Sequence, residues 1–409
     1  MRTLIKTHRI ELKPNATQAA IFRQCVGASR FAYNWALAEW QRQYQAGEKP
    51  NEAALRRQFN AIKPVEFPWI LDLPKSVPQQ AIKNVGTAFT NFFRRVREGI
   101  KPAGYPQFKK PFKRDSARLD NGPGTFQFDG KRVKLAKIGW VRMREALRFD
   151  GEPRSATLSR EAGRWFLSVP VLVSLPELPA VDARPAVGID LGVSVAATLS
   201  TGEKLAGPKP LKRYLRALKR CQRQHSRKVK GSNNRRKSAA RLAKLHARIA
   251  HIRKDWTHKT TTALTGRFAL IGVENLNVRG MMANDKLARS ISDIGFYEVR
   301  RQIEYKAALS GGVVVLVDRW FPSSKTCSEC GCYRESLPLS VREWTCAECG
   351  ARHDRDVNAA LNLRRVALAA GSCPASKACG EAGSGRSRKT PVKPASMKQE
   401  INHVSIGYG

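Results

Sequence analysis

Hydrophobic and polar positions follow a strand period in some segments of the chain and a helix period in others. Residues 3–12 mix β-branched and polar side chains and predict a strand. Apolar residues then recur at helical spacing, which predicts helices over residues 15–46, 53–63 and 78–98, with Asn15 as the first N-cap. We expect their aromatic side chains to form a small helical core.

A stretch rich in Pro, Gly and Lys, residues 100–124, predicts a linker and a boundary. Short alternating runs follow, and they predict antiparallel strands that turn at residues 129–130 and 161–163. These strands would form a sheet or a small barrel. The strand at residues 3–12 has no neighbour unless it pairs with them, so we expect a β module that the helices interrupt.

Beyond the next proline-rich segment, short apolar runs are separated by long helical segments. The first run carries Asp190, and the run at residues 267–275 places Glu274 where it ends. Residues 292–293 are expected to cap a further helix, and residues 311–320 predict a last buried strand. Strands that alternate with helices predict a mixed α/β unit.

Asp190 is out of place as a structural residue, because its run is apolar on both sides. A buried charge must be paired or bound to a metal. The alternative is an aspartate whose side chain only satisfies nearby backbone groups. The polar turn at residues 200–202 predicts a hairpin with Asp190 on its first strand.

Two C-x-x-C pairs stand 15 residues apart, which is the spacing of a four-thiolate zinc site. The four thiols are Cys327, Cys330, Cys346 and Cys349. Gly331 and Gly350 free the backbone after each pair. Two disulfides or four unrelated thiols are the alternatives, but no secretory signal precedes the chain, so a reducing compartment is expected. Cys332 is interpreted as a spectator.

An acidic segment follows the second cysteine pair and leads into a predicted helix. Asp354 and Asp356 lie at its start, where the helix dipole favours negative charge. Such a pair is often a cap alone. Metal binding becomes an alternative only because Asp190 and Glu274 are further acids in unusual positions.

The net charge of the chain limits the classes of molecule that it is expected to bind. Lys and Arg number 74 against 33 Asp and Glu in 409 residues, a net charge of +41. Such a chain requires a polyanion, and nucleic acid is the commonest. No apolar run approaches the roughly 20 residues of a spanning helix, and the basic residues are spread along the chain, which argues against a membrane. The length allows two or three domains.

Residues 209–254 concentrate this charge, with 18 Lys and Arg and no Asp or Glu. A break at residues 231–234 predicts two basic amphipathic helices. Like charges at helical spacing repel, and nearby phosphates would remove that repulsion, so we expect nucleic-acid contacts here without base readout. The candidates are Arg213, Arg216, Arg220, Arg223, Arg227, Lys228, Arg235 and Arg236.

Five motifs in order carry a family resemblance. They are GIDLG around Asp190, IGVENL around Glu274, FPSSKTCSECG, WTCAECG and HDRDVNAALN. Together they resemble the transposon-encoded TnpB family, relatives of the type V CRISPR effector nucleases. The resemblance runs from the first strand, through YNWAL at residues 33–37, to residue 363.

The resemblance implies an RNase H-like (RuvC) α/β nuclease domain with an inserted zinc ribbon, and a wedge β-barrel interrupted by a helical recognition insert. In this chain the barrel would take residues 1–13 and 106–180, and the insert residues 14–105. The nuclease domain would take residues 184–324 and 353–370. The zinc ribbon would take residues 325–352, and residues 371–409 would form a disordered tail.

The resemblance further implies RNA-guided, Mg²⁺-dependent cleavage of DNA by Asp190, Glu274 and Asp356. Asp356 is chosen because the D-x-N-A pattern starts there, and Asp354 is the runner-up. Residues i and i+2 of a helix do not share a face, so only one of the two should bind the metal directly. Two Mg²⁺ ions on carboxylates suit phosphodiester hydrolysis, and Zn²⁺ on the four thiols would be structural. Arg355 is expected to help place the phosphate.

The implied partners are a guide RNA from the transposon end and a target DNA duplex with a short flanking motif, which Lys75 and Gln79 are expected to contact. The expected location is the bacterial cytoplasm, on the nucleoid when DNA is bound. A guided regulator that binds without cutting and a transposase that joins strands remain alternatives. The oligomeric state stays open.

Overall fold

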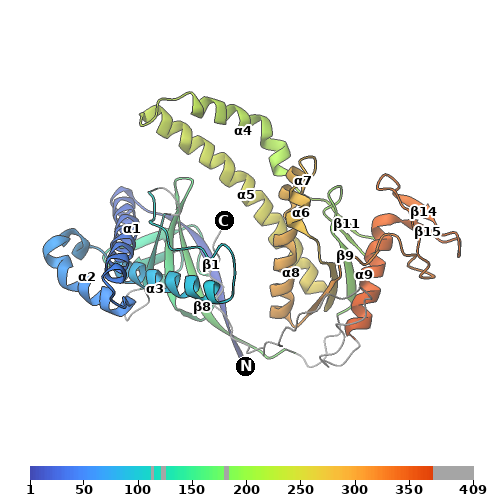
Figure 1. Ribbon diagram of the computed structural model, residues 1–409, viewed down its shortest axis with the longest axis horizontal. Helices are drawn as coiled ribbons and strands as arrows, with labels where there is room; N and C mark the ends of the chain where they lie inside the picture. Colours follow the sequence, from blue (N-terminus) through green and yellow to red (C-terminus); the bar gives the residue numbers. More distant parts are fainter. Residues whose placement is uncertain (112–114, 121–125, 179–183, 372–409) are drawn as a thin grey trace.

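The computed structural model describes residues 1–111, 115–120, 126–178 and 184–371 (Figure 1). The tail predicted to be disordered lies outside the described residues, apart from Gly371. Within these residues no helix is both long and apolar enough to cross a bilayer.

Eight strands of the described residues form one antiparallel sheet in the order β2-β7-β8-β1-β5-β4-β3, with β6 beside β8. Their bounds are β1 (Arg2–Lys13), β2 (Ser116–Asp120), β3 (Phe126–Asp129), β4 (Arg132–Leu135), β5 (Gly139–Met143), β6 (Glu152–Pro153), β7 (Ser155–Glu161) and β8 (Arg164–Leu175). Strand β1 pairs with β8 from Arg2 opposite Leu175 to Leu12 opposite Trp165. The expectation that the first strand joins strands far along the chain is therefore confirmed.

The linker predicted at residues 100–124 is wrong for residues 116–120, which form β2. This strand pairs with β7, and its Ala117 and Leu119 are buried in the sheet's core. Proline and glycine around the segment concealed the two alternating apolar positions that place it in the sheet.

Three helices are inserted between β1 and β2: α1 (Ala16–Gln45), α2 (Glu52–Glu66) and α3 (Ser76–Arg97), with a 3₁₀ turn η1 (Pro68–Asp72). Asn15 caps α1, because its side chain accepts a hydrogen bond from the Gln18 backbone while the Gln18 side chain bonds the Asn15 N–H. Trp40 of α1 stacks on Phe89 of α3 at 4.4 Å between ring centroids. The predicted aromatic helical core is confirmed.

A second sheet of the described residues has the order β11-β10-β9-β12-β13. Its strands are β9 (Ala186–Asp190), β10 (Ala197–Leu199), β11 (Lys204–Leu205), β12 (Leu270–Glu274) and β13 (Val313–Val317). Strands β9, β12 and β13 run parallel, and β10 and β11 run antiparallel to their neighbours. The turn predicted at residues 200–202 forms, but it joins β10 to β11. Asp190 lies instead on β9, which pairs with β10 after the loop at residues 191–196, so the predicted hairpin was placed one strand too late.

Helices cover both faces of the second sheet (Figure 1). Their bounds are α4 (Pro210–Ser226), α5 (Asn233–Arg267), α6 (Val278–Met282), α7 (Ala288–Ile294), α8 (Phe296–Ser310) and α9 (Arg355–Gly371). Helices α5 and α8 pack together on one face and α9 on the other, while α4 and the start of α5 project from the body as an arm (Figure 1). A short hairpin, β14 (Glu343–Thr345) and β15 (Arg352–Asp354), precedes α9.

Two predictions in this unit are wrong. Asp293 does not cap α8: it lies within α7, is 2% exposed, accepts hydrogen bonds from the backbone N–H groups of Leu211 and Lys212, and pairs with Arg253. It therefore anchors the first turn of α4. Strand β13 is not fully buried, because it lies at the sheet edge with Val313 and Leu316 exposed.

Candidate active site and thiol cluster

The central strands of the second sheet present different side chains to their two faces. Val187, Ile189, Ile271 and Val273 lie in one core with residues of α5 and α8. Because side chains alternate along a strand, Gly188 and Asp190 face the opposite side, as do Gly272 and Glu274. That opposite side is the one covered by α9.

Helix α9 approaches this side so closely that only glycine fits beneath it. A Cβ atom at Gly188 would lie 1.9 Å from the carbonyl oxygen of Ala360, and one at Gly272 would lie 2.5 Å from that of Leu363. The backbone of the helix therefore rests directly on β9 and β12. This contact fixes the height of α9 above the sheet.

The direction of α9 brings its first turn to the carboxyl ends of the strands. Gly371, the last residue of α9, lies against Leu270 at the start of β12, so the helix runs antiparallel to the strand. Gly188 contacts Ala360, and Asp190 lies two residues beyond Gly188 along β9. Asp356 lies one helical turn before Ala360, so it extends from the same contact toward the same edge of the sheet. Asp190 and Glu274 end neighbouring parallel strands in matching register. Three carboxylates from distant parts of the sequence thus lie near one edge of the sheet, although among the described residues only the four cysteines bring their ligand atoms within 4.8 Å of one another.

The pKa of Asp190 reflects the nearby carboxylates. Burial, and then the charges of Asp356 and Glu274, raise its pKa to about 7, against the opposite influence of Arg355 and Arg342. Burial also raises the pKa of Glu274. Carboxylates that resist ionisation together are a site where a divalent cation would relieve the repulsion.

The structure separates the two candidate acids at the start of α9. Asp354, at the end of β15, accepts hydrogen bonds from the backbone N–H groups of Asp356 and Val357 and pairs with Lys204 at 2.6 Å. Burial opposes ionisation of Asp354, but the hydrogen bond from Lys204 and the backbone donors lower its pKa overall. Asp354 is thus occupied as the helix cap, while Asp356 lies near Asp190.

Arg355 lies close enough to Asp190 to lower its pKa, but its guanidinium is occupied. Its side chain is 9% exposed and donates hydrogen bonds to the carbonyl oxygens of Pro338 and Leu337, which ties the cysteine segment to α9. The arginine that forms an ion pair with one of the three acids is Arg342, 3.4 Å from Asp356. Arg342 was missed because it lies in the loop between the cysteine pairs, where no spacing rule points to it.

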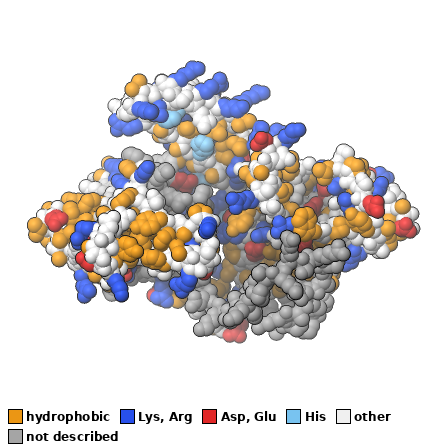
Figure 2. Space-filling model, in the orientation of Figure 1, with side chains coloured by type: hydrophobic (Ala, Val, Ile, Leu, Met, Phe, Trp, Pro, Cys, Tyr) orange, Lys and Arg blue, Asp and Glu red, His pale blue; other side chains and the backbone are white. Residues whose placement is uncertain are grey.

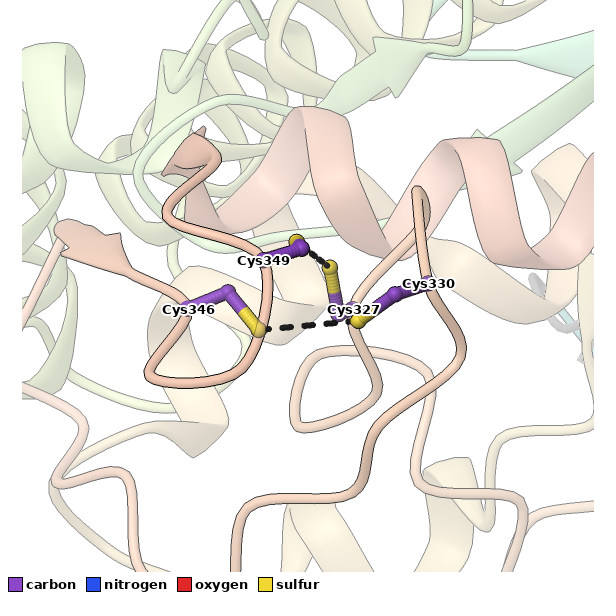
Figure 3. Close-up of side chains that lie close together, drawn as sticks. All are labelled: Cys327, Cys330, Cys346 and Cys349. Atoms are coloured by element: carbon purple, nitrogen blue, oxygen red, sulfur yellow. Dashed lines mark hydrogen bonds between the residues drawn. The ribbon is translucent and has the colours of Figure 1, made fainter.

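The four cysteines of the two C-x-x-C pairs gather in one cluster. Their sulfur atoms lie within 4.8 Å of one another, with Cys327 facing Cys349 and Cys330 facing Cys346 at 3.7 Å each (Figure 3). A disulfide requires about 2 Å, so the alternative of two disulfides is excluded. Gly331 and Gly350 have φ of 80° and 71°, as the tight turns require. Cys332 lies outside the cluster, as expected.

Polar side chains connect this cluster to α9. Asn358 accepts a hydrogen bond from the Ser328 N–H and donates to the Thr326 carbonyl, and Asn362 donates to the carbonyls of Ser323 and Thr326. Both asparagines are fully buried. The first cysteine turn is therefore attached to the helix that carries Asp356.

A second connection runs through His353, whose Nε2 lies 3.1 Å from the Cys327 sulfur. His353 belongs to β15 and packs against the Trp344 ring. The sequence analysis noted His353 as the first residue of the HDRDVNAALN motif, but the spacing of the motifs did not indicate that its ring would lie beside the Cys327 sulfur.

The predicted basic helices form as α4 and α5, and Lys and Arg line the arm they make (Figure 2). Most of the candidate residues on the arm are exposed to solvent. Arg235 is the exception, because it donates to the carbonyls of Lys228 and His225 and closes the loop between the two helices. Lys75, just before α3, is exposed, and Gln79 in its first turn is half-buried.

Family comparisons decide what kind of protein carries this arrangement. A family model described as a probable transposase matches residues 156–285, a Cas12f1-like TNB domain model matches residues 296–363, and a helix-turn-helix model matches residues 1–49. A Streptomyces pristinaespiralis protein, provisionally named an RNA-guided DNA endonuclease, is 38% identical over 100% of this chain and 99% of its own length. The chain belongs to the TnpB family. The resemblance read from the five motifs is thereby confirmed.

Further relatives agree with TnpB membership. InsQ of Escherichia coli K12, also provisionally named an RNA-guided DNA endonuclease, is 35% identical over 92% of this chain and 94% of its own. A solved Cas12f1 complex with single-guide RNA and target DNA matches with a TM-score of 0.54 and 14% identity. It covers 88% of this chain and 99% of the Cas12f1 chain, and it shows that the two share a fold.

Proposed function

We propose that this protein is an RNA-guided DNA endonuclease of a bacterial insertion sequence. The observation that carries the proposal is the meeting of Asp190, Glu274 and Asp356 at one sheet edge, which the contacts of α9 with Gly188 and Gly272 determine. Membership of the TnpB family supports the guided reaction. The basic arm supports a nucleic-acid partner.

In this proposal the second sheet with α5, α8 and α9 is an RNase H-like, RuvC-type nuclease domain over residues 184–324 and 353–370. The eight-stranded sheet would be the wedge barrel over residues 1–13 and 106–180. Helices α1 to α3 would be the recognition insert over residues 14–105. The order of the elements along the chain supports this division.

The three carboxylates suit Mg²⁺, a hard cation that prefers oxygen ligands. When bound there, two Mg²⁺ ions would neutralise charge on the phosphoryl group and lower the pKa of a bound water. Asp190 is close to both other acids and is suited to bridge two ions, with Glu274 and Asp356 each completing one. Arg342, 56% exposed beside Asp356, holds that carboxylate in place and has donors left for a phosphate oxygen.

The four thiols suit Zn²⁺ in a structural role. A tetrahedron with metal–sulfur bonds of roughly 2.3 Å has edges of about 3.8 Å. The two facing pairs at 3.7 Å match that edge. With four sulfur ligands no position remains for water, so the zinc ribbon over residues 325–352 would brace α9 through Asn358 and Asn362 rather than take part in chemistry.

The proposed partners are a guide RNA from the transposon end and a target duplex with a flanking motif. Exposed arginines of α4 and of the loop after it would contact phosphates, and guide pairing would read the sequence. Lys75 and Gln79, at the start of α3, would contact the flanking motif.

The test begins with the RNA that copurifies with the protein from cells. Sequencing is expected to identify a transcript from the end of the element. That RNA, a matching DNA target and Mg²⁺ should then give cleavage, and Asp190→Ala should abolish cleavage while RNA copurification persists. Absence of a specific transcript, or unchanged cutting by Asp190→Ala, would refute the proposal.

A further inference from the structure

A cavity of about 250 Å³ opens beside the carboxylate edge, and the reaction described above does not use it. Glu274 and the loop after β12 form one wall, the first turn of α8 forms a second, and Arg319, just past β13, completes the lining. The cavity therefore lies on the α8 side of the edge where Asp190 and Glu274 end their strands. A DNA strand bound at the carboxylates would therefore lie next to this opening.

The charged residues that line the cavity are arginines apart from Glu274. Arg279, Arg300 and Arg319 all line it. Arg300 is held by Asn275 at 2.6 Å and by Glu304 at 3.4 Å. Arg279 and Arg319 are exposed and have no ion pair with any described residue. Two free guanidinium groups at the mouth of a cavity are suited to bind phosphates.

The cavity also has an exposed aromatic ring. Tyr297 lines it and is 60% exposed, although the preceding residue, Phe296, is 1% exposed in the core. The buried neighbour fixes the first turn of α8, so the tyrosine ring is presented on a rigid element. Trp320, 83% exposed, follows Arg319 directly and adds a second ring at the same edge. Exposed rings interleaved with arginines are the pattern that binds unpaired bases.

We propose that this cavity binds one nucleotide of the DNA strand being cut, next to the scissile phosphate. The base would stack on Tyr297, and Arg279 and Arg319 would hold the flanking phosphates. A base inside a duplex has both faces covered by its neighbours, so the site selects a strand that has already been unpaired. This inference rests on the proposed function and adds to it the residues that guide the substrate strand into the carboxylates.

The decisive experiment is 2-aminopurine fluorescence in the complete complex of protein, copurified RNA and target DNA, with Ca²⁺ in place of Mg²⁺ so that the DNA stays uncut and the thiol cluster keeps its metal. The fluorescent base is placed in turn at each position around the cut in either strand. Stacking on an aromatic ring quenches the fluorescence, so the parent protein should quench one position beyond its neighbours. Tyr297→Leu should restore that signal, and Tyr297→Phe should retain the quenching. Tyr44→Leu, which removes an exposed ring of α1, should change nothing.

Cleavage kinetics with Mg²⁺ provide the second readout. One lost base–aromatic contact corresponds to roughly a tenfold weaker engagement of the strand. Tyr297→Leu should therefore slow single-turnover cleavage about tenfold, and Tyr297→Phe less than about twofold. Arg279→Gln and Arg319→Gln should each slow cleavage most at low salt, and the difference from the parent should shrink as salt rises, because each variant has lost one phosphate contact and its counterion release. Arg352→Gln, in the exposed hairpin before α9, is the matched control.

The outcomes separate this inference from the function on which it rests. If the parent complex does not cut its target, the proposed function fails. If the parent cuts and Tyr297→Leu neither restores fluorescence nor slows cutting, the nucleotide site is refuted. If Tyr297→Leu instead reduces copurified RNA and leaves the DNA signal quenched, the cavity serves the guide, which also overturns the proposal.

Discussion

The carboxylate edge and the thiol cluster are both attached to α9, yet they are built in opposite ways. The carboxylates come from positions 190, 274 and 356 and meet because two strands and one helix pack in a fixed register. The thiols come from two turns within residues 327–349 and need no distant partner to approach one another. One site therefore depends on the tertiary fold, and the other depends on local backbone geometry.

This contrast predicts how each site responds to damage. A change in the packing of α9 on the sheet should disturb the carboxylates and leave the thiol cluster formed. Loss of a thiol should first release the metal. It should move the carboxylates only indirectly, through the hydrogen bonds by which Asn358, Asn362 and Arg355 join the cysteine segment to α9. Four variants, ordered from the largest expected effect to the smallest, test this difference.

Cys346→Ser should give the largest change, because a four-thiolate site that loses one ligand no longer closes around Zn²⁺. We expect the zinc content, measured by mass spectrometry of the metal, to fall from about one ion per chain to nearly none. Cys332→Ser, which removes the thiol outside the cluster, should keep its zinc. Equal zinc content in Cys346→Ser and the parent would disprove the site.

Gly188→Ala should disrupt the contact between β9 and α9 that positions the carboxylates. Its Cβ would lie 1.9 Å from the Ala360 carbonyl oxygen, so α9 must shift. Overpacking of this kind costs roughly 1–3 kcal/mol. We expect a lower midpoint in thermal unfolding and slower cleavage with retained zinc. Gly266→Ala, within α5 and with open space around its Cβ, should not lower the midpoint.

Arg342→Gln should act on the carboxylate edge alone. Loss of its charge beside Asp356 is expected to slow cleavage roughly tenfold, the equivalent of about 1.4 kcal/mol in the barrier. RNA copurification and zinc content should match the parent. Arg352→Gln breaks an exposed ion pair with Glu343 in the same segment and is the control. Equal cleavage rates in the two variants would show that Arg342 has no part in the reaction.

The smallest effect concerns the interface of α5 with α8, away from both sites. Burial, and then the charges of Lys306 and Lys254, lower the pKa of His258 to about 4. The unfolded chain binds a proton near pH 6.5 while the folded chain does not, so stability falls as pH drops from 6.5 toward 4. His258→Gln should reduce the loss of thermal midpoint between pH 7 and pH 5, and His246→Gln, on the exposed side of α5, should not.

The same contrast explains what the sequence alone could predict. The cysteine spacing identified the cluster, and hydrophobic periodicity located the long helices and the return of the first strand to the large sheet. Side-chain pairings across the fold were not predictable, because no local pattern links Arg342 to Asp356, His353 to Cys327 or Asp293 to the start of α4. The hydrogen bonds of Arg355 to Leu337 and Pro338 were unpredictable for the same reason, since its position in the motif gives no information about the direction of its side chain.

The central claim is that Asp356, rather than its neighbour Asp354, completes the set of carboxylates that cuts DNA. The most direct measurement is Mg²⁺-dependent cleavage of a matching target by the two isosteric variants Asp356→Asn and Asp354→Asn, each loaded with its copurified RNA. We predict that Asp356→Asn loses cleavage by a thousandfold or more (about 4 kcal/mol). Asp354→Asn should keep cutting, with only a slightly lower thermal midpoint from the lost ion pair with Lys204, because asparagine can still cap the helix. Cleavage retained by Asp356→Asn and lost by Asp354→Asn would contradict the account.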